Sequence, residues 1–118
     1  MDKSIFDLED VLERVQGDKD LLLELMDIFS EDYAEKKDIL LDLLEDVNFE
    51  EIRNVAHSIK GAAGNISAKS VHAVAERIEK MAEHKEQKDL GDALRKMDEE
   101  FAKLVICMDE VRREFGTS

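Results

Sequence analysis

Apolar residues recur every three or four positions along most of the chain, and this spacing predicts amphipathic helices. The last predicted helix has the most regular pattern, a heptad seam in which steps of four and three alternate. The seam consists of Leu90, Leu94, Met97, Phe101, Leu104, Met108, Val111 and Phe115. The whole pattern predicts a short helix from Phe6 to about Val15 and longer helices from Lys19 to Glu45, Phe49 to about Ile66, Ala68 to about His84, and Leu90 to about Phe115.

Capping residues separate these helical patterns from one another. Gly17 followed by Asp18 is typical of a helix end and a new N-cap. Asn48, with Glu51 three residues later, resembles a capping box at the start of the third helix. We expect the remaining caps to be Ser67 for the fourth helix, Asp89 for the last helix and Gly116 for its end.

These elements predict an all-α fold, an antiparallel up-and-down four-helix bundle with a short extra N-terminal helix, because short connections make consecutive helices antiparallel neighbours. The composition agrees, since the chain has no proline, 43% hydrophobic residues and 40% charged residues. A length of 118 residues fits one domain that needs no metal or disulfide to hold its core. We therefore assign residues 1–118 to a single domain.

The net charge excludes several classes of partner. At −13, the chain lacks the excess of cations that nucleic acid or an anionic membrane surface would require. No apolar run approaches the ~20 residues of a membrane span, and no signal-peptide pattern opens the chain. The single cysteine, Cys107, cannot form an internal disulfide, which fits a reducing compartment. We therefore expect a soluble, cytoplasmic protein.

The third predicted helix presents a histidine on its outer face. Its apolar residues lie within about 50° of a common direction at ~100° per residue, and His57 points about 150° away from that direction, toward solvent. Gly61 follows His57 by one turn, Gly64 lies further along the same side, and Lys60 projects from the neighbouring flank. The apolar positions are Ile52, Val55, Ala56, Ile59, Ala63 and Ile66.

The two glycines indicate that the surface beside His57 is kept clear. Each costs roughly 1 kcal/mol relative to alanine inside a helix, so folding gives no reason to place both there. Without these side chains another protein can approach the imidazole, and Lys60 can place its ammonium beside an anion on the ring. A solvated imidazole is largely neutral at pH 7 and is a competent nitrogen nucleophile. This arrangement suits phosphoryl transfer, which needs mainly in-line positioning and charge stabilisation.

The segment from Ala56 to Ile66 resembles the signature of the histidine phosphotransfer (HPt) family: a histidine, an aliphatic residue two positions on, Lys-Gly, small residues and another aliphatic residue. The resemblance implies a four-helix bundle in which His57 is phosphorylated on Nε2. It also implies that Lys60 neighbours the phosphate and that Gly61 gives steric clearance. Similar family features are Phe6-Asp7-Leu8, the Gly17-Asp18 break, residues 75–79, and the apolar stripe of the second predicted helix, which consists of Leu22, Leu25, Met26, Phe29 and Tyr33.

The resemblance also leads to expectations for two further positions, Glu79 and Ser67. Glu79 stands on the next helix, where many family members have Gln or Glu near the phosphorylated ring. A hydrogen bond from Glu79 to the imidazole and a salt bridge on the helix surface are both compatible with its position. Ser67 stands where the family usually has glycine, and we expect it to change the turn modestly.

The partners that the resemblance implies are receiver domains of response regulators or hybrid histidine kinases, which carry the phosphoryl group on an aspartate. No acidic pocket is evident around His57, so we expect the receiver to supply Mg²⁺. We expect no metal or cofactor belonging to the chain itself. No Gly-rich phosphate loop is present, so the chain is not expected to be an enzyme that phosphorylates itself from ATP.

Two other functions remain open. The heptad seam would also suit a phosphate-independent interaction module that pairs through its last helix, although a bundle buries the same seam and we expect a monomer. The phosphotransfer module of a chemotaxis-type histidine kinase has a very similar histidine motif, and would need further domains in a longer chain.

The other candidate residues are read as structural. His72 and His84 lack metal-ligand spacing and are expected on ordinary surface, His84 near a helix C-terminus. Cys107 falls off the heptad seam and is expected to be partly buried. The first helix has more apolar residues than so short a helix needs to bury, so some are expected to face a partner: Ile5, Leu8, Val11 and Leu12.

Overall fold

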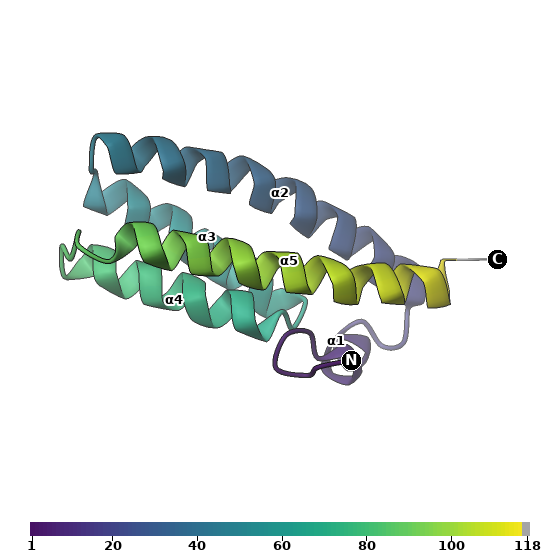
Figure 1. The fold of residues 1–118 in the computed structure, drawn as a ribbon. Helices are drawn as coiled ribbons and strands as arrows, with labels where there is room; N and C mark the ends of the chain where they lie inside the picture. Colours follow the sequence, from purple (N-terminus) through teal and green to yellow (C-terminus); the bar gives the residue numbers. More distant parts are fainter. Residues whose placement is uncertain (117–118) are drawn as a thin grey trace.

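The computed structural model describes residues 1–116, and this range contains five helices and no strand (Figure 1). The four long helices form an elongated bundle in which sequence neighbours run antiparallel, with α1 at the end where α3 turns into α4 (Figure 1). The predicted all-α bundle is confirmed. The helices are α1 (Leu8–Arg14), α2 (Lys19–Glu45), α3 (Phe49–Asn65), α4 (Lys69–Glu83) and α5 (Leu90–Phe115).

Most of the predicted helix boundaries are confirmed by capping contacts. The Asp18 and Asn48 side chains accept hydrogen bonds from the third backbone N–H of α2 and of α3, at 3.0 and 3.2 Å. Gly116 ends α5 as expected. Asp89 is the N-cap residue of α5, but its side chain makes no capping hydrogen bond, so the predicted mechanism is wrong there. The first helix is shorter than predicted because Asp7 caps it.

Ser67 does not cap α4, contrary to the prediction; Ala68 is the N-cap residue, without a side-chain hydrogen bond. Ser67 instead ends α3 with a left-handed backbone, at a φ of 58°. Its N–H donates to the Gly64 carbonyl at 3.2 Å, and the Ala68 N–H donates to the Ala63 carbonyl at 2.9 Å, the pattern of a Schellman motif. Glycine adopts this conformation most readily, because a side chain disfavours a left-handed backbone.

The core lies along the interior of the bundle. The heptad seam of α5 faces inward, since its residues are buried except for the half-buried Phe101 and Phe115. Cys107 is also buried, more fully than expected. In the first helix Val11 is fully buried, and its three apolar neighbours are half-buried against the core. The bundle end therefore covers Val11 completely and Ile5, Leu8 and Leu12 in part, and the expectation that some of this apolar surface faces a partner stays a prediction.

Candidate functional site

The buried face of α3 determines where His57 points. Ile52, Ala56 and Ile59 are at most 1% exposed, so this side of the helix is fixed against the bundle. His57 lies on the opposite side, and 67% of its side chain is exposed. The outward direction predicted from helical periodicity agrees with this placement. Another protein can reach the ring without any rearrangement of the bundle.

A buried carboxylate on α4 holds both polar residues of the α3 site. Glu79 Oε2 lies 2.5 Å from His57 Nδ1, and Glu79 Oε1 accepts a hydrogen bond from Lys60 Nζ at 2.6 Å. Only 9% of the Glu79 side chain is exposed, compared with 24% for Lys60. Glu79 therefore makes both of the contacts that its position in the sequence allowed, a hydrogen bond with the imidazole and a salt bridge with a lysine. Glu79 lies beneath the ring instead of on the helix surface.

The charge state of Glu79 fixes the tautomer of the ring. Burial raises the pKa of this carboxyl, but the hydrogen bonds from Lys60 and His57 outweigh burial, and its pKa lies below its ordinary value. The hydrogen bond to Glu79 in turn raises the pKa of Lys60. An ionised carboxylate can only accept, so Nδ1 must carry the hydrogen. In the neutral ring the lone pair is then on Nε2, which makes no hydrogen bond to any residue in the described range 1–116.

The two glycines of α3 have different surroundings. A Cβ added at Gly61 would meet no atom within 4 Å, so the surface there is open. A Cβ at Gly64 would lie 3.5 Å from His72 Nδ1, an ordinary contact distance. Gly61 is thus the stronger candidate for clearance beside His57, and the space at Gly64 is shared with His72.

His72 is more than ordinary surface, contrary to the prediction. It is half-buried, and its Nδ1 donates to the backbone carbonyl of Lys60 at 3.0 Å, which ties α4 to α3 next to the site. The sequence offered no signal for this contact, because it depends on how the two helices are rotated. His84 fits its predicted place at a helix end: its Nδ1 donates to the Lys80 carbonyl at 2.9 Å.

The side chains of the described residues do not assemble a metal centre around the ring. Within residues 1–116 no three His, Cys, Asp or Glu residues are grouped so that they could hold a metal ion. Among the same residues, no helix is long and apolar enough to span a membrane.

The comparison with protein families identifies the arrangement. The family model described as "Hpt domain" matches residues 24–114, which span α3, α4 and most of the other two long helices. The chain belongs to the Hpt domain family. Searches of curated proteins and of solved structures gave no significant match. This match confirms the family that the motif around His57 resembles. Hpt domains carry out histidine phosphotransfer in two-component phosphorelays and interact with receiver domains.

Proposed function

We propose that this Hpt domain accepts a phosphoryl group on Nε2 of His57 and passes it to, or receives it from, an aspartate of a receiver domain. The supporting observation is an imidazole that is 67% exposed and whose Nδ1–H is held by a buried carboxylate. The hydrogen bond orients the ring, and the exposed side presents a nitrogen lone pair to a partner.

The transfer needs little covalent work from this chain. The Nε2 lone pair attacks phosphorus, the bond from phosphorus to the aspartyl oxygen breaks, and the aspartate leaves as a carboxylate. The imidazole becomes positively charged, with phosphorus on Nε2 and hydrogen on Nδ1. The Glu79 carboxylate, 2.5 Å from Nδ1, stabilises that charge, as a carboxylate does for the catalytic histidine of serine proteases. The reverse steps return the phosphoryl group to an aspartate.

Lys60 and the receiver share the stabilisation of the phosphoryl oxygens. Lys60 is one helical turn from His57. Its ammonium donates a hydrogen bond to Glu79, whose other oxygen contacts the His57 ring. A side-chain rotation would exchange the contact with Glu79 for one with a phosphoryl oxygen, and a lysine ammonium is charged at pH 7 with or without Glu79. We expect Mg²⁺ to come with the receiver, whose carboxylates would hold it beside the transferring group.

The other functions that the sequence left open differ in their support. Pairing through the heptad seam would require the last helix to leave the bundle, since Leu90, Met97 and Leu104 are at most 1% exposed. This favours a monomer. A phosphotransfer module of a chemotaxis-type kinase would use the same histidine, and differs in where the phosphoryl group comes from.

The proposal is tested by incubating the chain with a panel of receiver domains phosphorylated on aspartate and following the label. We expect label on the wild-type chain that is labile in acid and stable in base, as a phosphohistidine is, and none on His57→Gln. His84→Gln is the matched control, because His84 is an exposed histidine at the end of α4. Transfer to His57→Gln at the wild-type rate would refute the assignment of His57.

A further inference from the structure

Two side chains of α4 hold the same residue of α3. His72 Nδ1 donates to the backbone carbonyl of Lys60 at 3.0 Å, and Glu79 Oε1 accepts from the Lys60 ammonium at 2.6 Å. In a helix the carbonyls point toward the C-terminal end, whereas the side chains tilt toward the N-terminal end. Lys60 is therefore held from both directions along α3, through its backbone and through its side chain.

Gly64 leaves the Lys60 carbonyl accessible to the imidazole of His72. In an α-helix the N–H of residue i+4 bonds to the carbonyl of residue i, so Gly64 lies next to this oxygen. The oxygen has a second lone pair that can accept from His72. A Cβ on Gly64 would lie 3.5 Å from His72 Nδ1, so a side chain longer than that of alanine would compete with the ring for this space. The glycine thus makes room for a contact between the two helices.

The contacts of Glu79 depend on how far α4 is shifted along α3. His72 and Glu79 are seven positions apart, about two turns and roughly 10.5 Å along the axis, so they lie on one stripe of α4. Within residues 1–116, no side chain other than these two makes a hydrogen bond from α4 to α3. Both contacts of Glu79 are short, at 2.5 and 2.6 Å, so a shift of α4 by the rise of one residue, ~1.5 Å, would break them. His72 is the polar contact that fixes this offset from outside the site.

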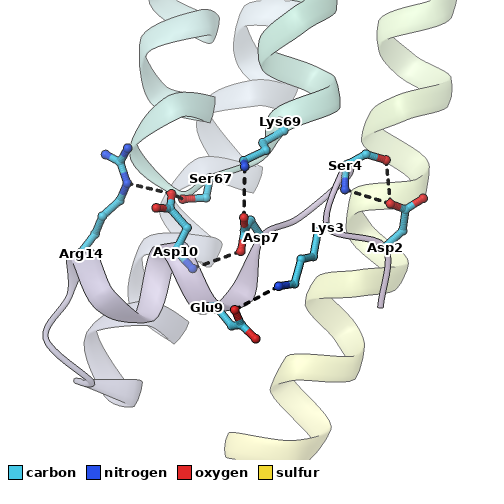
Figure 2. A network of polar contacts seen from close by, with 9 residues as sticks. All are labelled: Asp2, Lys3, Ser4, Asp7, Glu9, Asp10, Arg14, Ser67 and Lys69. Atoms are coloured by element: carbon cyan, nitrogen blue, oxygen red, sulfur yellow. Dashed lines mark hydrogen bonds and ion pairs between the residues drawn. The ribbon is translucent and has the colours of Figure 1, made fainter.

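The contacts at the turn between α3 and α4 hold a different part of the molecule (Figure 2). Ser67 donates to Asp10 at 2.5 Å, and Lys69 pairs with Asp7 at 3.1 Å (Figure 2). Both contacts tie the turn and the start of α4 to the N-terminal segment, and neither involves a residue of α3. The Lys69 side chain is 55% exposed, so water competes for its ion pair. These contacts anchor the bundle end, while His72 acts further along α4, between the turn and Glu79.

We propose that His72 is a positioning residue for His57. By holding the Lys60 carbonyl, His72 keeps α4 at the offset at which one carboxylate of Glu79 reaches both the imidazole and the Lys60 ammonium. Glu79 then keeps the hydrogen of the His57 ring on Nδ1 and the lone pair on Nε2. His72 acts only through Lys60 and Glu79, because it makes no hydrogen bond with His57. The consequence for phosphoryl transfer rests on the proposed function, whereas the tautomer of His57 does not.

The inference is tested by measuring the tautomer of His57 in the full chain with ¹⁵N NMR, in the absence of any phosphoryl donor. His72→Leu removes the donor, and His72→Asn keeps an amide N–H close to the position of Nδ1. His84→Leu is the matched control, because His84 Nδ1 donates to the Lys80 carbonyl at 2.9 Å, within α4 itself. We expect His57 to keep its hydrogen on Nδ1 in the wild type, His72→Asn and His84→Leu, and to become a mixture of both tautomers in His72→Leu. An unchanged His57 tautomer in His72→Leu, or the same mixture in His72→Asn, overturns the inference.

A further variant separates positioning from a general loss of stability. Ser67→Ala removes the hydrogen bond to Asp10 at the turn and leaves the Lys60 carbonyl untouched. We expect it to lower the melting temperature while His57 keeps its hydrogen on Nδ1. If Ser67→Ala shifts the tautomer as far as His72→Leu does, loosening of the bundle explains the shift and the role of His72 is refuted.

The same variants are then compared in single-turnover transfer from the receiver domain that the panel selects. His72→Leu should slow transfer about tenfold, and His72→Asn and His84→Leu should stay within about twofold of the wild type, because a small misplacement of a reacting group is costly. Equal rates in His72→Leu and His84→Leu would contradict a role of His72 in transfer. The expected tautomers without transfer in the wild type would refute the proposed function and retain the positioning of His57. Normal transfer with the same tautomer in every variant would do the reverse.

Discussion

Two glutamates in this bundle are equally buried, at 7% exposure, and both have a pKa below the ordinary value, yet they do different things. Glu100 pairs with Lys96 and Lys103 on its own helix, at 3.2 and 2.9 Å. Glu79 reaches from α4 to α3, where it holds an imidazole and a lysine.

The difference lies in where the partners of each carboxylate are. The lysines of Glu100 are about half exposed, so water competes for both and little depends on the pairing. Lys60 is 24% exposed, and the ring that Glu79 holds is the one that we propose is phosphorylated. A buried carboxylate with local partners stabilises its own helix, whereas one with partners on another helix can fix the orientation of a reactive group.

The largest difference in transfer rate is expected between the variants that remove one or the other of these two carboxylates. Glu79→Ala should slow phosphoryl transfer to His57 by about 10- to 100-fold, because the ring loses the charge-assisted hydrogen bond that orients it and stabilises its positive charge. The transfer rate of Glu79→Gln should lie between those of the wild type and Glu79→Ala, since an amide oxygen still accepts a hydrogen bond from Nδ1. Glu100→Ala should change the single-turnover rate less than twofold. Equal rates for Glu79→Ala and Glu100→Ala would contradict the role proposed for Glu79.

The lysines give a smaller contrast. Lys60→Ala should slow transfer about tenfold, the loss expected when one charge-assisted contact to the phosphoryl group is removed. It should also lower the melting temperature measurably, because Glu79 loses its cation. Lys103→Ala leaves Glu100 with Lys96 and should leave transfer unchanged. If Lys60→Ala lowers the melting temperature but not the rate, Lys60 is structural only.

The glycines give the smallest contrast in rate. Gly61→Ala should stabilise the fold by about 1 kcal/mol and slow transfer a few-fold, because a methyl group then stands in the open space beside His57. Gly91, in the first turn of α5, has equally open surroundings. Because α5 carries none of the side chains of the site, Gly91→Ala should leave transfer unaffected. Denaturant unfolding and single-turnover transfer, measured on the same samples, separate stability from clearance. Unchanged transfer in Gly61→Ala would show that clearance there is not needed.

Local rules were sufficient for most of the fold. Helical periodicity located the buried faces, and Asp18 and Asn48 marked where α2 and α3 begin. The same periodicity placed His57 outward. Ser67 departs from the capping rule, because the turn needs a left-handed residue here and the Ser67 hydroxyl donates its hydrogen bond to Asp10.

The sequence by itself determined which residues face outward on α3 and which chemistry they share, because spacing along a helix converts directly into direction. It also determined that no acidic residue occurs between Glu51 and Glu76. Only the tertiary structure decided that Glu79 lies beneath His57 with Lys60 on its other oxygen, and that His72 bonds to the Lys60 carbonyl. These contacts depend on the rotation and offset of α4 against α3, which the packing of both buried faces sets together.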